Sequence, residues 1–449
     1  MMSVNAAIAC TRFGYGAAPG EIRRVARLGA RNWLIKQLAP ENVTPPRHPL
    51  LQPAKKRLLE TIGPFGRRGF DEQSKDDKRA YFTQSTAILT QEARIRTKQG
   101  VNTEAPFAER LVRFWTNHFT VSARTAELQV TVGAFEREAI RPHIFGSFTK
   151  LLQAATFHHA MLIYLDNAVS VGPNSSHGRS GRRGLNENHA RELLELHTVG
   201  EAAGFTQDDV LETAKILSGW TIGTRHHYEP WLGTVIFGNG MHEPGRHVVL
   251  NTLFGSNGRQ QAYQLLDSLA LHPATARRLA TKLAAHFVAD DPPASLVNRL
   301  EASYLRSRGQ LKALYTTLIN SPEAWEPRMQ KIKTPEDFVL STGRSIGVDA
   351  ILRSSANALS SMGQPPFEAP SPKGWPDRGE FWMSPDSMIK RIDWMTEVVS
   401  KAKPHNPEAL LADTLGPLVS PETQELVLKT SDPAKAVAIA LLSPDFQRR

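Results

Sequence analysis

The stretch NENHARELLELHTVGEAAGFTQDDVLETAKILSGW, residues Asn186 to Trp220, decides the fold of this chain. Apolar residues recur in it at every third or fourth position on both sides of a glycine-containing turn, which predicts two amphipathic helices. The same periodicity runs through most of the chain, without the alternation of strands and helices that builds a parallel sheet. We therefore predict a mainly α-helical, multi-helix globular protein.

One segment, residues 221–250, departs from this pattern. It is rich in glycine, aromatic and β-branched residues, which favour strands and tight turns. We predict a small β-hairpin or ribbon here, with Gly238-Asn239-Gly240 near a turn. Because 449 residues exceed the roughly 250–300 that one hydrophobic core usually serves, we expect one domain with two helical lobes, about 1–220 and 251–449, joined by this insertion.

The composition narrows the class of protein. A hydrophobic share of 41% and a charged share of 22% are ordinary for a soluble globular protein. Lys and Arg exceed Asp and Glu by 54 − 44, a net charge of +10 that attracts anions, but the basic residues are scattered and no nucleic-acid-binding motif accompanies them. The single cysteine, Cys10, excludes intrachain disulfides and metal sites built from several cysteines.

No segment of the sequence has the features of an export signal or a membrane span. The first residues lack a charged start followed by an apolar run, and no window approaches the roughly 20 apolar residues that cross a bilayer. As written, the chain is expected to be cytoplasmic. The alternative, a periplasmic protein, requires that its start has been assigned wrongly.

Helical geometry divides the first helix of the opening stretch into two faces. At about 100° per residue, His197 falls on the apolar face. The polar face holds one arginine, one asparagine and three carboxylates: Glu187, Asn188, Arg191, Glu192 and Glu195. One interpretation is a cleft in which stacked carboxylates have shifted pKa values. The other is a solvated charge ladder with one structural histidine.

The same geometry bears on metal binding. Glu195 and His197 lie nearly opposite each other, and the H-E-x-x-H and E-x-x-H patterns of zinc and di-iron helices are absent from this helix. His189 and Glu192 are three residues apart and share a face, but a third ligand must come from elsewhere. We therefore predict no metal ligands in this helix. The cofactor is unknown, and no specific motif supports a divalent metal.

Two further histidines and one loop are notable. Asn117-His118 ends the stretch ERLVRFWTNHF, where a helix C-terminus stabilises an imidazolium suited to general acid catalysis; the alternative is a histidine packed on its aromatic neighbours. His242 lies in a turn beside the predicted ribbon, a common setting for catalytic side chains. Residues 363–385 carry six prolines and four aromatic residues, which is more than a mere spacer requires.

Several stretches together identify a family. They are RFGYGAAPGE (Arg12 to Glu21), RFWTNHF (Arg113 to Phe119), YLDNAVSVGPNS (Tyr164 to Ser175), NENHARELLELHTVG (Asn186 to Gly200), FTQDDV, SGW, HEPGRHVVL, HFVADDPP and GQPPFEAPSPKGWPD. With them, nearly the whole chain resembles the bacterial domain-of-unknown-function family 1800. The family pattern includes Asn117, His118, Asn186, Glu187, Asn188, Arg191, Glu192, Glu195, His197, Gln207, Asp208, Trp220 and the His242 turn, but not His189.

The resemblance implies no established activity. It does imply a companion protein that looks like a phosphatase or sulfatase, and export signals in many members. Two hypotheses follow. The first is an enzyme, with hydrolysis and metal assistance as the chemistry considered, acting on a polar or anionic substrate. Its candidate catalytic residues are His118, Glu192, His197 and His242, and its candidate substrate-binding residues are Asn117, Asp166, Asn188, Arg191 and Glu195.

In the enzyme hypothesis, a histidine acts as general base or metal ligand, and Arg191 with the asparagines orients the substrate.

The second hypothesis is a non-catalytic protein: a partner or maturation factor for the companion phosphatase- or sulfatase-like protein, or a polyanion-binding protein. In that case the polar helix face is a structural network. The sequence decides neither the reaction nor the oligomeric state.

Overall fold

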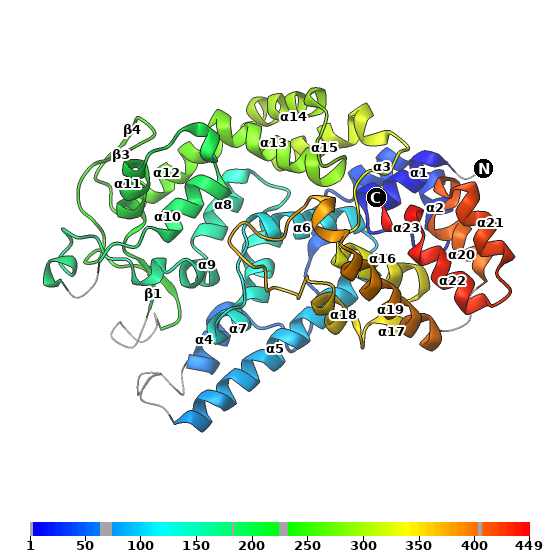
Figure 1. Cartoon of the computed structure of the whole chain (residues 1–449). Coiled ribbons are helices and arrows are strands. Elements are labelled where there is room, and N and C mark those ends of the chain that lie inside the picture. Colours follow the sequence, from blue (N-terminus) through cyan, green and yellow to red (C-terminus); the bar gives the residue numbers. More distant parts are fainter. Residues whose placement is uncertain (1–2, 63–73, 182–183, 224–231, 403–405) are drawn as a thin grey trace.

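The structure, a computed structural model, describes all residues except 1–2, 63–73, 182–183, 224–231 and 403–405. The described residues form 23 α-helices, joined by short π-helical and 3-10 turns, and four strands of three residues each. The predicted mainly α-helical class is confirmed. Figure 1 shows an elongated molecule, with the strands at one end and the C-terminal helices at the other.

The first quarter of the chain contributes five helices. The longest, α5, begins at a Ser74 cap whose hydroxyl accepts the Asp77 N–H, and it reaches away from the body of the molecule beside α4 (Figure 1). The bounds are α1 (Val4–Ile8), α2 (Glu21–Leu28), α3 (Ala30–Lys36), α4 (Ala54–Ile62) and α5 (Lys75–Asn102).

Six helices follow, and α6 is the central one, since eleven of its thirteen residues are buried. Its buried Glu109 is neutralised by Arg141, whose guanidinium donates to both carboxylate oxygens at 2.8 and 2.7 Å. Such a fork is the geometry in which a buried charge is tolerated. The bounds are α6 (Pro106–His118), α7 (Ala126–Phe135), α8 (Phe148–Thr156), α9 (His159–Tyr164), α10 (Asn188–Glu192) and α11 (Gln207–Leu217).

The predicted ribbon consists of two separate antiparallel pairs. Strand β1 (Trp220–Ile222) pairs with β2 (Val235–Phe237), and β3 (His247–Val249) pairs with β4 (Thr252–Phe254). Gly238-Asn239-Gly240 lies at a turn, as predicted, but this turn follows β2 and does not join the two strands of a hairpin. Part of the β1–β2 connection, residues 224–231, lies outside the described residues.

Twelve helices complete the chain. Seven of them begin with proline, which has no N–H to lose at the first helical position. The bounds are α12 (Arg259–Leu271), α13 (Pro273–Phe287), α14 (Ala294–Arg306), α15 (Leu311–Asn320), α16 (Pro335–Ile346), α17 (Val348–Ile351), α18 (Ser355–Ser361), α19 (Pro385–Lys401), α20 (Pro407–Thr414), α21 (Pro421–Lys429), α22 (Pro433–Leu442) and α23 (Pro444–Gln447).

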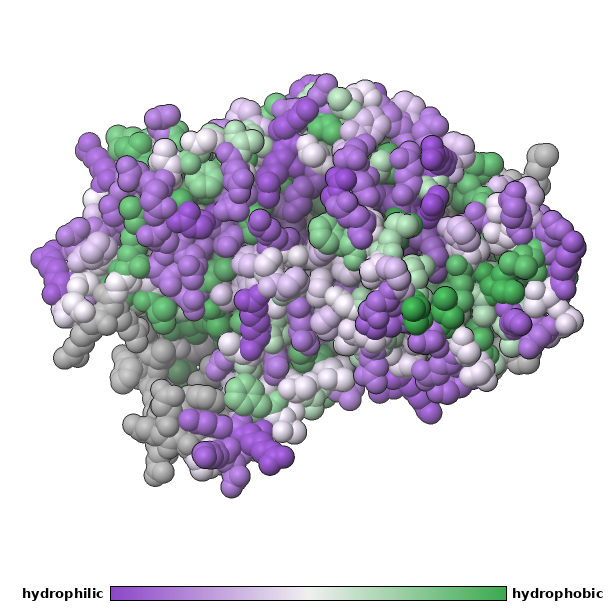
Figure 2. Space-filling model, viewed as in Figure 1, coloured by the Kyte–Doolittle hydropathy of each residue, from purple (hydrophilic) through white to green (hydrophobic). Residues whose placement is uncertain are grey.

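The core has two hydrophobic clusters. The larger one takes buried side chains from Ala6 to Trp325 together with Phe367, and the smaller one takes Tyr15, Val101 and side chains of 338–446. The boundary between the two clusters lies near α16. The clusters are not the two predicted lobes, and the division into lobes at residues 221–250 stays a prediction. Outside, hydrophilic residues predominate on the face in Figure 2, and hydrophobic residues gather over the C-terminal helices.

Polar groups cross the boundary between the clusters. Arg110 on α6 donates to Asp337 on α16 at 2.7 Å, and Arg113 donates to Glu336 at 2.6 Å. Both arginines are buried. Since buried charges are stable only when paired, these ion pairs stabilise the boundary between the clusters.

Candidate functional site

A cavity of about 200 Å³ lies at this boundary. Most of its wall comes from four segments: the second half of α6, the last turns of α13, the start of α16, and residues 364–377 of the proline- and aromatic-rich loop. Single residues from elsewhere complete it: Tyr15, Arg96 of α5, Thr120, Val121 and Leu359. In Figure 1 this loop is the long yellow-to-orange trace beside α6. The ionisable residues of the wall are Arg96, Arg110, Arg113, His118, Lys282, His286, Glu336, Asp337 and Asp377.

Asn117 holds the loop against α6. Its side-chain amide donates to the Trp375 carbonyl at 3.0 Å, and its side-chain oxygen accepts the Trp375 N–H at 2.8 Å. Gly374 fits beside this pair with φ +82°, where a Cβ atom would lie 2.6 Å from the Asn117 oxygens. Asn117, a predicted substrate-binding residue, thus lines the cavity while its amide is engaged by the backbone of the loop.

His118 and Lys282 meet in the cavity wall. The carbonyl of His197 can only accept, so the Nε2 atom of His118, 3.1 Å away, carries the ring proton. The Nδ1 atom then accepts from Nζ of Lys282 at 3.2 Å. Burial, followed by the Lys282 charge, holds the pKa of His118 well below its ordinary value. Burial also lowers the pKa of Lys282 to about 8.

The state of His118 differs from that expected at a helix C-terminus. The side chain is only 2% exposed and packs edge-on against Phe119, with ring centroids 4.6 Å apart, and against Trp115 at 5.2 Å. The cost of burying an imidazolium therefore outweighs the helix dipole. His118 is neutral and a hydrogen-bond acceptor for Lys282, not a charged general acid.

His286 and Asp377 form a second pair in the wall. The Nδ1–H of His286 donates to Oδ1 of Asp377 at 2.9 Å, while its Nε2 atom is buried and has no hydrogen-bond partner in the described part of the chain. Burial lowers the pKa of His286 to about 4, although Asp377 opposes the shift. The imidazole is therefore neutral at pH 7 and keeps a free lone pair on Nε2.

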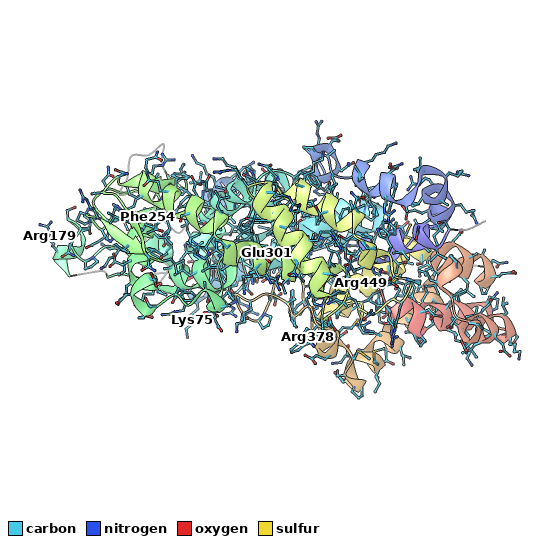
Figure 3. All side chains as sticks on the ribbon, turned by 90° about the horizontal axis from the view of Figure 1, so that it is seen from above. Lys75, Arg179, Phe254, Glu301, Arg378 and Arg449 are labelled. Carbon is cyan, nitrogen blue, oxygen red and sulfur yellow. The ribbon has the colours of Figure 1, made fainter. Side chains whose placement is uncertain are left out.

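Asp377 stays ionised although it is partly buried. Burial alone would raise its pKa, but His286, Lys331 and Arg449 together hold the pKa below its ordinary range. Lys331 lies 3.4 Å from one carboxylate oxygen and Arg449 lies 3.6 Å from the other. Figure 3 shows Arg449 close to Arg378, the residue that follows Asp377 in the loop. A fixed carboxylate behind a neutral histidine is the arrangement that orients a general base.

The remaining cations of the wall are paired. Arg110 is bound to Asp337, while Arg96 and Arg113 share Glu336. Among the ion pairs of the described residues, none involves Lys282. Its ammonium group is consequently the cation of the wall that is available to an incoming anion.

The Asn186–His197 helix has a different geometry from the predicted one. Only Asn188–Glu192 is α-helical, and Leu193–His197 forms a π-helical turn. The hydroxyl of Thr198 donates to the Leu193 carbonyl at 2.6 Å and closes this wider turn. Because a π turn holds more residues than an α turn, the expectation of 100° per residue is wrong beyond Glu192. His197 is nevertheless buried, as predicted.

Part of the predicted polar face is a surface network. Arg191 donates to Glu187 at 3.2 Å and to Gln207 at 2.7 Å. The amide of Asn188 donates to Asp166 at 3.3 Å. The predicted substrate-binding residues Asp166, Asn188 and Arg191 therefore contact one another or their neighbours, and none of them lines the cavity.

Glu192 at the end of α10 and Glu195 in the π-helical turn are the other two carboxylates of the predicted polar face. Burial and then Glu195 raise the pKa of Glu192, while Arg191 and Lys373 of the loop act in the opposite direction. Glu195 interacts with Arg278, whose pKa is nonetheless lowered by burial. Neither carboxylate lines the cavity.

The other two predicted catalytic histidines also lie outside the wall. His197 lies next to His118, with ring centroids 6.3 Å apart, and its buried Nε2 atom has no hydrogen-bond partner within the part of the chain that the structure describes. His242 packs on Phe237 and its Nδ1 lies 3.0 Å from the Ser218 carbonyl. Of the predicted site residues, the structure brings Asn117 and His118 together in the cavity.

Comparison with known proteins assigns the chain to a family. A family model described as "Protein of unknown function (DUF1800)" matches residues 8–448. The chain belongs to the DUF1800 family. No curated protein and no solved structure matches it. The match spans every residue of the cavity wall, so the site is part of the DUF1800 domain and not of an addition to it.

Three residues with candidate roles in the chemistry of the DUF1800 cavity were not among the predicted site residues: Lys282, His286 and Asp377. Two of them stand in stretches that carry the family resemblance, His286 in HFVADDPP and Asp377 in GWPD. The unusual composition of the loop was a second signal. Lys282 has no such signal, because nothing in the sequence places it beside His118, which is 164 residues away.

Within the described part of this DUF1800 chain, no helix is long and apolar enough to cross a membrane. In the same residues, Glu138, His158 and His159 form a cluster of potential metal ligands, which does not line the cavity.

Proposed function

We propose that this chain is an enzyme that uses acid–base catalysis in the cavity between α6, α13, α16 and the 363–384 loop. The substrate carries an anionic or polar group, and hydrolysis is the reaction class that this chemistry serves. The observation that carries the proposal is the His286–Asp377 pair, in which a partly buried carboxylate accepts the Nδ1–H bond and Nε2 finds no hydrogen-bond partner among the described residues.

In this proposal His286 is the general base. With Nδ1 protonated and bound to Asp377, the Nε2 lone pair accepts a proton from water or from a substrate hydroxyl. Asp377 is a positioning residue that fixes the tautomer and stabilises the imidazolium formed in the reaction. The ion pairs of Asp377 with Lys331 and Arg449 keep its carboxylate in place.

Lys282 supplies the positive charge. Its pKa of about 8 leaves it mostly protonated at pH 7, and His118 accepts one of its three N–H bonds. The other two are free to bind an anionic group or a developing oxyanion. In a buried wall such an interaction is stronger than in water, because the local dielectric constant is lower.

The test measures release of p-nitrophenol from its acetate, phosphate and sulfate esters by the purified chain. We expect turnover of at least one ester, and a loss of about 100-fold or more in His286→Gln and Lys282→Met. Lys401→Met is the matched control, because Lys401 is exposed and pairs with Glu397 on the surface. Equal turnover in all variants overturns the proposal.

A second outcome favours the non-catalytic alternative. If no ester is turned over, but phosphate or sulfate raises the melting temperature of the chain and this shift disappears in Lys282→Met, the cavity is an anion-binding site without chemistry. The chain is then best explained as a polyanion-binding protein or as a partner of the companion phosphatase- or sulfatase-like protein.

A further inference from the structure

A cluster of two histidines and one carboxylate lies apart from the cavity. Glu138 belongs to the π-helical turn that continues α7, and His158 and His159 open α9. One oxygen of Glu138 and one nitrogen of each histidine all lie within 4.8 Å of one another. Ligand atoms that surround a zinc ion at about 2.0–2.2 Å lie no more than roughly 4.4 Å apart, so a small adjustment closes this set around one ion.

His159 has the hydrogen bonding of a metal ligand. Its Nε2 lies 2.8 Å from the Gly233 carbonyl and therefore donates a proton to it. Its Nδ1 consequently keeps a lone pair, and this atom is buried without a hydrogen-bond partner in the described residues. Histidines that bind metals typically donate their second ring N–H to a carbonyl or carboxylate in this way.

Glu138 is held as an oriented carboxylate. One oxygen accepts the Ala54 N–H at 3.0 Å, and the other lies 3.0 Å from Nε2 of His158. These two hydrogen bonds fix the orientation of the carboxylate next to the two histidines.

His158 couples the cluster to the start of α9. Its Nδ1 accepts the Ala160 N–H at 3.1 Å and caps the helix, so its Nε2 carries the ring proton and donates to Glu138. An ion bound at Nε2 takes the place of that proton, which moves to Nδ1. Ala160 then loses its acceptor, and metal binding is linked to a change at the first turn of α9.

We propose that Glu138, His158 and His159 bind one divalent metal ion of the zinc type. Two imidazoles and one carboxylate are donors that zinc accepts, and three protein ligands leave a position for water. The proposal does not depend on the cavity, since none of the three residues lines it.

Cobalt(II) is the probe, because its absorption reports coordination number while Zn²⁺ is silent. The full chain, treated with a chelator and then titrated with Co²⁺, is expected to bind one ion and to develop the visible bands of a four- or five-coordinate site that Zn²⁺ abolishes. Glu138→Gln and His159→Ala are expected to weaken Co²⁺ binding by about 100-fold or more, since even partners of ligands are worth that much. A wild-type chain that binds no Co²⁺ overturns the proposal.

His158→Asn separates ligation from helix capping. Asparagine is an efficient helix cap, so the variant keeps α9 capped while it removes the imidazole. His272 caps α13 in the same way, with its Nδ1 3.1 Å from the Ala274 N–H, which makes His272→Asn the matched control. We expect His158→Asn to lose the Co²⁺ bands and His272→Asn to keep them. Retention of tight binding in His158→Asn, or equal loss in both variants, contradicts the three-ligand site.

Discussion

His286 and Asp377 stand 91 residues apart in the chain, yet Nδ1 of the histidine lies 2.9 Å from the carboxylate of the aspartate. The histidine comes from α13 and the aspartate from a loop that Asn117 of α6 holds in place. Three elements must therefore be assembled before the pair exists. The consequence is that the chemistry of the cavity depends on the position of the loop as much as on the residues themselves.

Asp377→Asn tests the positioning role of the carboxylate. An amide no longer stabilises the imidazolium and favours the other tautomer, so kcat is expected to fall by about 100-fold to 10,000-fold with little change in KM. Steady-state kinetics on the ester that gives turnover measures this. Asp386→Asn is the control, because Asp386 forms an exposed pair with Lys390. A change confined to KM would contradict the role.

Gly374→Ala tests the attachment of the loop. Gly374 and Gly363 both have positive φ, at +82° and +86°, but a Cβ atom would meet Asn117 and Thr120 only at Gly374. Gly363→Ala therefore measures the conformational cost alone, about 1 kcal/mol. We expect Gly374→Ala to lower the free energy of unfolding by about 1–3 kcal/mol more than this control. Chemical denaturation compares the two, and equal losses would show that the contact is unimportant.

The pH dependence of turnover follows from two groups. His286, with a pKa of about 4, acts as a base only when neutral, so activity rises as the pH passes upward through about 4. Lys282, with a pKa of about 8, binds an anion only when charged, so activity falls above about pH 8. The dependence of kcat/KM on pH checks both the rise near pH 4 and the fall above pH 8. Lys282→Met should abolish the fall above pH 8. If the fall remains in this variant, it belongs to another group.

The charged form of Lys282 is also expected to lower the free energy of unfolding. Its folded pKa of about 8 lies below the ordinary 10.5, so the folded state disfavours the charged form. The penalty is complete below pH 8 and fades as the pH rises toward 10.5. Lys282→Met should therefore stabilise the chain by about 1–2 kcal/mol at pH 7, after loss of the bond to His118. Thermal unfolding at pH 7 and 10.5 tests this, and destabilisation at pH 7 would contradict it.

Thr198→Val tests the π-helical turn of the Asn186–His197 segment. The Thr198 hydroxyl donates to the Leu193 carbonyl at 2.6 Å, and both residues are buried. Valine keeps the shape but leaves a buried carbonyl with fewer partners, so we expect a loss of about 1–3 kcal/mol in unfolding free energy. Thr90→Val removes the equivalent bond to Thr86 at an exposed position and should change stability by only a few tenths.

Local features of this protein were predictable from its sequence. The mainly α-helical class followed from the spacing of apolar residues, and the family followed from motifs such as RFWTNHF and NENHARELLELHTVG. His197 is buried, as its predicted place on the apolar face implied, although the helical geometry behind that prediction holds only as far as Glu192. These properties depend on residues within a few positions of one another, which is the range over which periodicity carries information.

The site itself depends on contacts that no local pattern reports. The Asn186–His197 helix holds many polar groups, but Asn188 bonds to Asp166, Arg191 bonds to Glu187 and Gln207, and none of the predicted residues of this helix lines the cavity. The cavity instead unites His118, Lys282, His286 and Asp377 from α6, α13 and a loop. Sequence alone determined the mainly α-helical class and the family to which the chain belongs. Only tertiary packing decided which ionisable side chains are buried together, because burial and charge pairing are set by elements that meet far from one another in the chain.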